Sequence, residues 1–353
     1  MRSWTDAFRG RRVLITGGLG LIGSNLAHAL VRLKARVTIV DALLPMYGGN
    51  MHNIAEIINR VTLHRSDVRD EETMGRLVRD KDFIFHLAAQ VSYLDSVTDP
   101  FLDLDVNCRG QLVLLEACRR FNCGTKVLFA GSRLQFGATS SNPVDEEHPQ
   151  RPVLPYAIHK LAAERYLQMY HQLFDLRTVV LRLANPYGPR QQMKHSRYGI
   201  VNWFIRQAME GRVITVFGDG RQQRDYVYVD DVVRAFLMAA ASERSVGEIF
   251  NVGSGQGCAF AEMAATVVRT VGSGRVEFVA WPDHYRSTDT GDYVTDIGKI
   301  SRLLGWRPRV GIAEGIARTH RFYVRRAAHY WSEEPRPTCD AVAAAPVREA
   351  TPW

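Results

Sequence analysis

The sequence predicts an α/β protein built on a doubly wound parallel sheet, with a second, smaller and discontinuous α/β domain. Three observations support this fold class. The first half of the chain alternates short β-rich apolar runs with longer segments of helical periodicity, which implies parallel strands joined by crossover helices. A glycine-rich turn joins the first strand to the first helix. After Asn185 a Pro/Gly-rich loop follows, and the later strands are shorter and irregularly spaced.

Six strands are expected up to residue 185, at residues 12–18, 36–42, 61–67, 82–90, 126–132 and 177–185. Helical periodicity marks segments between them, including residues 21–34, 107–121 and 155–167. Residues 247–255 have the pattern of one more strand of the same sheet, so the second domain is interrupted. We therefore assign residues 10–184 plus about 248–257 to the sheet domain and residues 185–247 plus 258–330 to the smaller domain. Residues 331–353, rich in Pro and Ala without periodicity, are expected to form a disordered tail.

Composition excludes several function classes. The 353 residues are 46% apolar and 23% charged, as in ordinary globular proteins, and no apolar run approaches the roughly 20 residues needed to span a bilayer. The first ten residues lack the apolar core of a signal peptide, so we expect a cytoplasmic protein without membrane partners. Five cysteines without a C-x-x-C pair indicate reduced thiols and no metal site. The net charge of +8 comes from scattered arginines, which disfavours nucleic acid but suits a phosphorylated ligand.

The glycine turn has the pattern of a dinucleotide site. Gly17, Gly20 and Gly23 lie between the first predicted strand and helix, where glycine lets the backbone approach a pyrophosphate at the helix N-terminus. Asp41 ends the second strand about 20 residues later, where a carboxylate binds a ribose 2′-hydroxyl and repels a 2′-phosphate. The sequence therefore predicts a Rossmann-type domain that binds NAD rather than NADP. The contacts expected in this turn are Gly17, Gly20, Leu21, Ile22 and Gly23.

Asp67 follows the third predicted strand, and Val68 comes next. The carboxylate could meet the adenine edge of the cofactor, with Val68 beside it. It could equally be the N-cap of the following helix. The residues alone leave both interpretations open.

Tyr156 and Lys160 are a candidate chemical pair. They are four residues apart at the start of an amphipathic helix, hence on one face. A phenol is a poor base at neutral pH, because its ordinary pKa is about 10. A nearby ammonium and a cationic nicotinamide would lower that pKa, so that the tyrosine can remove a proton from a sugar hydroxyl.

Seven segments occur in the order seen in extended short-chain dehydrogenases/reductases: TGGLGLIGS, HLAAQVS, FAGSRLQFG, PYAIHK, LRLANPYGPRQ, GDGRQQRDYVYVDD and LGWRP. More narrowly, the chain resembles the NAD-dependent nucleotide-sugar epimerase/dehydratase family, from about Arg11 to Arg326. This resemblance implies a nucleotide-diphosphate sugar as substrate, most often a UDP-sugar. It also implies a homodimer joined through helices that include the one carrying Tyr156.

The resemblance also implies roles for single residues. Leu87, Ala88 and Ala89 of HLAAQ would line the cofactor, and Ser132 would hold the reacting hydroxyl beside the tyrosine. The substrate's phosphate side would meet Asn185, Arg224 and Arg286. Arg286 is placed by the spacing of Asp289, Asp296 and Lys299, although another register would make it a surface arginine. Arginine suits these positions because its fork binds phosphate oxygens bidentately.

The residues after Ser132 bear on the reaction. Family members that eliminate water or decarboxylate resemble one another in having carboxylates one or two positions after the catalytic Ser or Thr. Here those places hold Arg133 and Leu134, neither of which can act as the acid. We therefore expect an epimerase, acting at C4 through a 4-keto sugar.

Arg133 itself has two interpretations. It could contact a polar or acidic sugar, such as a uronic acid, or narrow the pocket, or it could point away to pair with an acidic neighbour. Gly131, in place of a more usual serine, is expected to leave extra room.

Other functions remain as alternatives. A decarboxylase or dehydratase, for example one acting on UDP-glucuronate, could find its acid elsewhere, for instance at Asp95. A keto-sugar reductase would need an exchangeable, usually phosphorylated cofactor, which Asp41 opposes. A non-catalytic nucleotide sensor on the same fold would be expected to lose the Tyr156–Lys160 pair, which is present.

Overall fold

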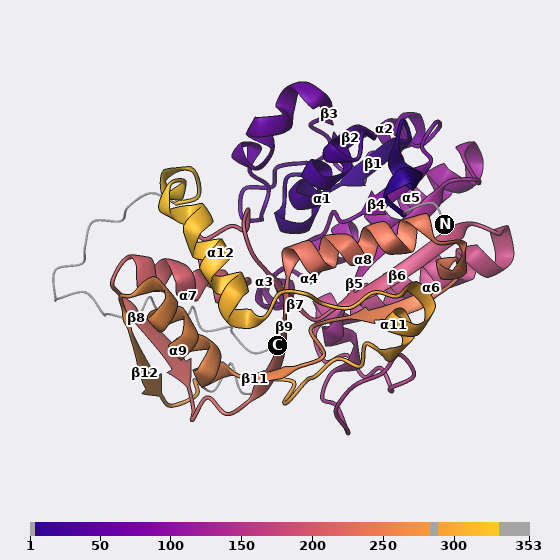
Figure 1. Ribbon diagram of the computed structural model, residues 1–353. Coiled ribbons are helices and arrows are strands. Elements are labelled where there is room, and N and C mark those ends of the chain that lie inside the picture. Colours follow the sequence, from indigo (N-terminus) through magenta and orange to yellow (C-terminus); the bar gives the residue numbers. More distant parts are fainter. Residues whose placement is uncertain (1–3, 283–288, 332–353) are drawn as a thin grey trace, which may run out of the picture.

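The computed structural model describes residues 4–282 and 289–331. Arg286 and the tail from residue 332 onward lie outside the described residues. Within them the elements form one large sheet flanked by helices, with a smaller region beside its carboxyl-terminal edge (Figure 1).

The large sheet has seven parallel strands, as the fold class predicts. Its order is β10-β6-β5-β4-β1-β2-β3, so the chain starts near the middle and winds outward in both directions. The last strand to join, β10, pairs with β6 and confirms the strand expected within residues 247–255. The strands are β1 (Arg12–Thr16), β2 (Arg36–Val40), β3 (Val61–His64), β4 (Phe83–His86), β5 (Lys126–Ser132), β6 (Arg177–Leu183) and β10 (Ile249–Val252).

Helices cover both faces of this sheet because alternate strand residues are buried on opposite sides. Val13 and Ile15 belong to the core on one side, and Leu14 between them belongs to the core on the other. The first side is covered by α1 (Leu21–Arg32) and α8 (Val229–Ala241), which contact each other (Figure 1). The second side is covered by α2 (Glu71–Leu77), α5 (Gly110–Phe121) and α6 (Pro155–Phe174).

Short helical elements complete this part of the chain. Two of them, α3 (Tyr93–Thr98) and α4 (Pro100–Leu104), contact α6, and a π-helical turn η3 connects α4 to α5. The 3₁₀ turn η4 follows β5 directly. The turns are η1 (Trp4–Phe8), η2 (Met51–Arg60), η3 (Asp105–Arg109) and η4 (Arg133–Phe136).

The smaller region is built from interrupted segments. A three-stranded sheet has the order β11-β9-β7, and a parallel pair joins β12 to β8. The strands are β7 (Asn185–Tyr187), β8 (Val213–Phe217), β9 (Gln223–Tyr228), β11 (Gly257–Ala259) and β12 (Arg275–Val279). The helical elements are α7 (Ile200–Met209), α9 (Phe260–Val271), α12 (Ile312–Val324) and η6 (Ala327–His329). Two later elements pack instead against the large sheet and its helices: η5 (Glu243–Ser245) contacts α8, and α11 (Gly298–Leu304) contacts β10. Because β7 starts two residues after β6 ends, the chain passes directly from the large sheet into this region.

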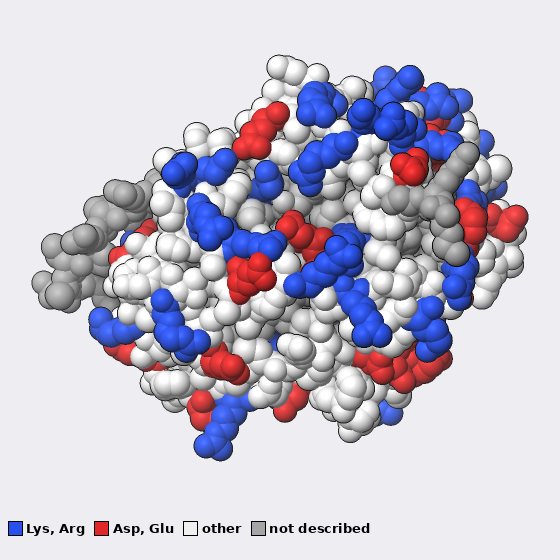
Figure 2. Space-filling view, viewed as in Figure 1, with Lys and Arg blue, Asp and Glu red and all other residues white. Residues whose placement is uncertain are grey.

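Charge is distributed over the face that carries α1, α8 and α12. Lys and Arg side chains are spread across it with Asp and Glu among them (Figure 2). Among the described residues, no helix combines the length and the apolar character that a membrane span requires.

Candidate active site

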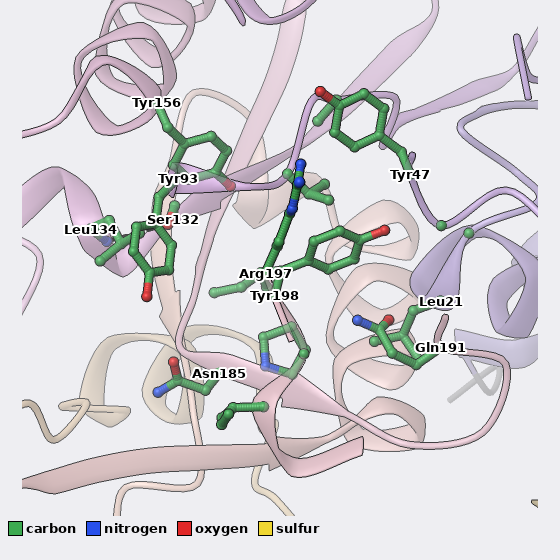
Figure 3. Close-up of a pocket in the computed structure, with 18 of the residues that line it drawn as sticks. Leu21, Tyr47, Tyr93, Ser132, Leu134, Tyr156, Asn185, Gln191, Arg197 and Tyr198 are labelled. Atoms are coloured by element: carbon green, nitrogen blue, oxygen red, sulfur yellow. Dashed lines mark hydrogen bonds between the residues drawn. The ribbon is translucent and has the colours of Figure 1, made fainter. Parts of the chain in front are cut away.

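A pocket of about 640 Å³ opens at the carboxyl ends of the parallel strands. Its walls come from the turns after β1, β2, β4 and β5, from the start of α6, and from the smaller region. The strand order reverses between β1 and β4, which is where ligands bind in open parallel sheets. Figure 3 shows one wall with Tyr156, Ser132 and Leu134 and the opposite wall with Tyr47 and Tyr198.

The glycine turn lies at one end of this pocket. Gly17 has a φ of 66°, and a Cβ there would lie 2.7 Å from the Ala88 nitrogen. A Cβ at Gly23 would lie 2.3 Å from the Gly17 carbonyl oxygen, so a side chain would separate α1 from the turn. A Cβ at Gly20 would have the Gly17 oxygen, 3.6 Å away, as its nearest neighbour. Gly20 lines the pocket, so this open space belongs to the pocket. The turn therefore leaves room for a pyrophosphate at the N-terminus of α1.

Asp41 follows β2 and is fixed by backbone donors. The Leu19 N–H donates to Oδ2 at 3.0 Å, and the Leu43 N–H donates to Oδ1 at 2.9 Å. Burial raises the pKa of Asp41, and these two hydrogen bonds oppose that rise. Since each carboxylate oxygen can accept more than one bond, Asp41 can also bind ribose hydroxyls. The residues present therefore fit NAD, whose other expected neighbours line the same pocket: Leu21, Ile22, Val68, Leu87, Ala88 and Ala89.

Asp67 also lines the pocket, but it is not the cap of α2. The N-cap is Asp70, whose side chain accepts from the Thr73 N–H, so that alternative for Asp67 is wrong. Asp67 instead pairs bidentately with Arg69, at 2.9 and 2.8 Å. The hydrogen bonds from the Arg69 side chain are the main cause of the lowered pKa of Asp67. Contact with the adenine edge stays a prediction.

Tyr156 and Lys160 lie in the first turns of α6 and line the pocket together. The Lys160 ammonium donates to the Ala130 carbonyl at 3.1 Å and lies 4.7 Å from the centre of the Phe129 ring. Burial lowers the pKa of Lys160 to about 8, and the charge of Asp103 opposes this. Burial also raises the pKa of Tyr156, the Asp103 charge raises it further, and a hydrogen bond with Ser132 opposes the rise. The expected lowering of the Tyr156 pKa by Lys160 is therefore not seen among the described residues.

Ser132 ends β5 and is held in place on two sides. Its hydroxyl accepts from the Leu134 N–H at 3.2 Å, and its own N–H donates to Gln135 Oε1 at 2.9 Å, which together form a capping box for η4. Figure 3 shows Ser132 next to Tyr156 on the same wall, with Leu134 beside them. The two hydroxyls can therefore bind the same substrate hydroxyl.

Beneath this wall is a buried polar network that the sequence analysis missed. The Arg182 guanidinium pairs with Glu164 at 2.7 and 2.9 Å, and Gln135 Nε2 donates to Glu164 at 3.0 Å. Through Gln135 the network reaches the backbone of Ser132. One sequence signal was present, since Arg182 interrupts the apolar run at the end of β6, residues 179–183.

A second missed pair lies behind Lys160. The Asp103 carboxylate is fully buried, and its Oδ1 lies 2.5 Å from His159 Nδ1. Burial raises the pKa of Asp103, and the hydrogen bond with His159 opposes this. Asp103 thus places a negative charge close enough to influence the titration of both Tyr156 and Lys160.

Arg133, Asn185 and Arg224, which are expected to meet the substrate, line the same pocket, and we call their part of it the substrate end. Arg133 Nε donates to Asn185 Oδ1 at 3.3 Å, and its Nη1 donates to the Thr290 hydroxyl at 3.1 Å. Burial, followed by the charge of Arg224, lowers the pKa of Arg133 to about 10. Arg224 itself is paired with Asp289 at 2.5 Å.

Arg133 does not point away to an acidic neighbour, because within residues 4–282 and 289–331 no ion pair joins it to a carboxylate. The expectation for Gly131 is wrong. Gly131 lines the pocket, but a Cβ there would lie 3.1 Å from Gln135 Oε1 and 3.3 Å from Arg182 Cγ, so a side chain would point at the buried network and its absence does not enlarge the pocket.

The profile of the NAD dependent epimerase/dehydratase family matches residues 13–253. The chain belongs to this family, and NAD is its cofactor.

Two curated relatives and one solved structure show how near the members are. The chain is 36% identical to the UDP-glucose 4-epimerase of Mycolicibacterium smegmatis over 88% of this chain and 98% of that protein. It is 32% identical to the dTDP-glucose 4,6-dehydratase of an Actinoplanes species over 91% of this chain and 99% of that protein. The structure of Thermus thermophilus UDP-glucose 4-epimerase complexed with NAD aligns with a TM-score of 0.80 at 35% identity. The alignment covers 89% of this chain and 99% of that chain. The protein is thus an enzyme of nucleotide-sugar metabolism, and these similarities alone do not separate epimerases from dehydratases.

Proposed function

We propose that the protein is an NAD-dependent epimerase that inverts C4 of a nucleotide-diphosphate sugar. A single observation carries the proposal: the residues that follow Ser132 in the pocket wall, Arg133 and Leu134, include no group that can deliver a proton at neutral pH. Epimerisation needs proton transfer at one hydroxyl, whereas elimination of water needs a further acid. UDP is the proposed nucleotide, because the UDP-glucose 4-epimerase relatives reach 36% identity.

Each side chain has a defined part in this reaction. Ser132 holds the C4 hydroxyl, and Tyr156 removes its proton as C4 is oxidised. Tyr156 acts as a phenolate and becomes a neutral phenol when it takes this proton. The charge of Lys160, whose ammonium lies 6.0 Å from the centre of the Tyr156 ring, favours the phenolate form before the transfer. NAD, when bound, supplies the reversible two-electron acceptor. The 4-keto sugar then turns over in the pocket, and Tyr156 returns the proton when the other face of C4 is reduced.

A decarboxylase or dehydratase remains the second candidate, supported by the dTDP-glucose 4,6-dehydratase relative at 32% identity. Such an enzyme would need a free carboxylate near the sugar. In the described part of the pocket wall the acidic residues are Asp41, Asp67 and Asp289, and each is engaged by backbone donors or by an arginine. Asp95, the acid suggested by the sequence, is outside the wall and pairs with Arg197 at 2.8 Å.

Proton NMR of the purified protein, incubated with nucleotide sugars and no added cofactor, tests this proposal. The panel contains UDP-glucose, UDP-galactose, UDP-N-acetylglucosamine and UDP-glucuronate. We expect a mixture of two C4 epimers from at least one of them, reduced by about 10²- to 10⁴-fold in rate in Tyr156→Phe. Release of CO₂, loss of water or an accumulating 4-keto product would instead establish the second candidate.

A homodimer is proposed for the assembly. Helices α3 and α4 contact α6, and this surface exposes large apolar side chains, with Phe101 78% exposed. The others are Val97, Leu104, Val153 and Ile158. Sedimentation of the purified chain tests the dimer, and a monomer would refute it. The cytoplasmic location also stays a proposal, which cell fractionation tests.

A further inference from the structure

We infer that Arg133 and Tyr226 form a receptor for an anionic substituent of the sugar, so that the preferred substrates are nucleotide derivatives of uronic acids. This inference rests on the proposed function, because it concerns the sugar bound at the same site. It adds the chemical class of the sugar, which neither the family nor its named relatives define for this chain.

Arg133 is the exception among the buried arginines of the described residues. Three arginines are buried there, and two of them have carboxylate partners: Arg182 pairs with Glu164, and Arg206 pairs with Glu210. Arg133, 9% exposed, has only neutral acceptors, the Asn185 amide oxygen and the Thr290 hydroxyl. A buried charge without a counter-charge is costly, and an anion brought by the substrate would remove that cost.

Donors remain available for such an anion. A guanidinium carries five N–H groups in a fork that matches a carboxylate, and two of them are used in the bonds to Asn185 and Thr290. The Tyr293 ring lies 5.3 Å from the Arg133 guanidinium carbon and limits the orientation of the side chain. Arg133 also lines the pocket, so its remaining donors are next to the ligand space.

Tyr226 provides a second, independent observation. It lines the same pocket and is 4% exposed, and its hydroxyl has no hydrogen-bond partner among the described residues. Tyr226 on β9 is paired in register with Asn185 on β7, so both side chains leave the same face of that sheet. Since Asn185 contacts Arg133, the Tyr226 hydroxyl belongs to the same corner of the pocket. A buried donor without an acceptor is expected to find one in the ligand.

The diphosphate of the substrate is the other anion that could occupy this corner. The position of Arg133 favours the sugar substituent, because Arg133 directly follows Ser132, which holds the C4 hydroxyl in the proposed reaction. In a pyranose the C5 carboxylate of a uronic acid is adjacent to C4, whereas the diphosphate leaves from C1 at the opposite end of the ring. A carboxylate at C5 therefore lies closer to the residue next to Ser132.

Calorimetric measurement of ligand binding to the NAD-loaded Tyr156→Phe protein distinguishes the sugar carboxylate from the diphosphate as the anion bound by Arg133. The measurement does not depend on turnover. The ligands are UDP, UDP-glucose and UDP-glucuronate. We expect UDP-glucuronate to bind about ten-fold or more tightly than UDP-glucose, and Arg133→Gln to weaken UDP-glucuronate by about 10- to 100-fold. UDP and UDP-glucose should change by less than about three-fold.

Matched variants make the result specific. Arg221→Gln removes the same charge from an exposed side chain outside the pocket wall and should leave all three affinities unchanged. Arg133→Lys should recover part of the preference. Tyr226→Phe should reduce it by about two- to ten-fold, and tests the receptor even if Arg133→Gln does not fold.

Two outcomes would overturn the inference. An equal loss for UDP, UDP-glucose and UDP-glucuronate in Arg133→Gln would assign Arg133 to the diphosphate. Equal binding of UDP-glucose and UDP-glucuronate by the parent protein would show that the corner does not select an acid. Since binding is measured without turnover, a clear preference for the acid together with CO₂ release in the NMR experiment would refute only the epimerase.

Discussion

The cofactor end and the substrate end of the pocket are built differently. At the cofactor end the turn and Asp41 lie within residues 17–41, and the contacts are set by backbone: Gly17 and Gly23 permit close approach, and backbone N–H groups fix the carboxylate. At the substrate end, Arg133, Asn185 and Thr290 meet from distant parts of the chain through side chains. One end is a local steric arrangement, and the other depends on buried polar contacts over long range.

Breaking the buried Glu164–Arg182 ion pair should have the largest effect on stability. This pair supports the substrate end, because Glu164 is connected to Ser132 through Gln135. We expect Glu164→Gln to lower the free energy of unfolding by about 3 to 5 kcal/mol, because it leaves the Arg182 guanidinium buried without a counter-charge. Urea denaturation measures this. Glu314→Gln is the matched control, since it breaks an exposed pair with Arg318 and should cost less than about 0.5 kcal/mol. Similar losses for the two variants would show that the buried network does not support this wall.

This difference between the ends explains how much the sequence could predict. The parallel sheet, β10 and the glycine turn follow from local periodicity and spacing, and all three are confirmed. The partners of Glu164 could not be predicted, because residues 135 and 182 approach it only when β5, β6 and α6 pack together. The same holds for Asp103 and His159, which are 56 positions apart.

Some predictions failed for the same reason. Gly131 was expected to enlarge the pocket, but the direction of its missing side chain depends on the twist and pairing of β5, which the sequence does not show. Asp67 was a possible helix cap because Asp67 and Asp70 are equally good capping residues, and only the start of α2 distinguishes them. Long-range ion pairs and side-chain directions are therefore the parts that required the structure.

Substitutions at two glycines of the cofactor end should distinguish a glycine that the fold requires from a glycine that leaves room for NAD. We expect Gly23→Ala to lower the free energy of unfolding by about 1 to 3 kcal/mol and to reduce bound NAD, because its Cβ would lie 2.3 Å from the Gly17 oxygen. Gly20→Ala should leave the unfolding free energy nearly unchanged but still reduce bound NAD, since its Cβ points into the pocket. Denaturation together with NAD content after purification measures both. If Gly20→Ala retained full NAD content, the pyrophosphate would not lie over this turn.

The smallest expected effect is a shift in the pH profile of kcat, which depends on the charge of Asp103. Lys160 lines the pocket and has a pKa of about 8, so its ammonium is lost, and activity that depends on its charge falls, as the pH rises through about 8. The Asp103 charge raises the pKa of Lys160 and of Tyr156, so removing it in Asp103→Asn lowers both. The whole profile of kcat against pH should therefore move to lower pH. His159→Gln keeps the Asp103 charge and distinguishes charge from pairing: a shift in Asp103→Asn alone supports the electrostatic role, whereas equal shifts in both variants would assign the effect to the Asp103–His159 contact.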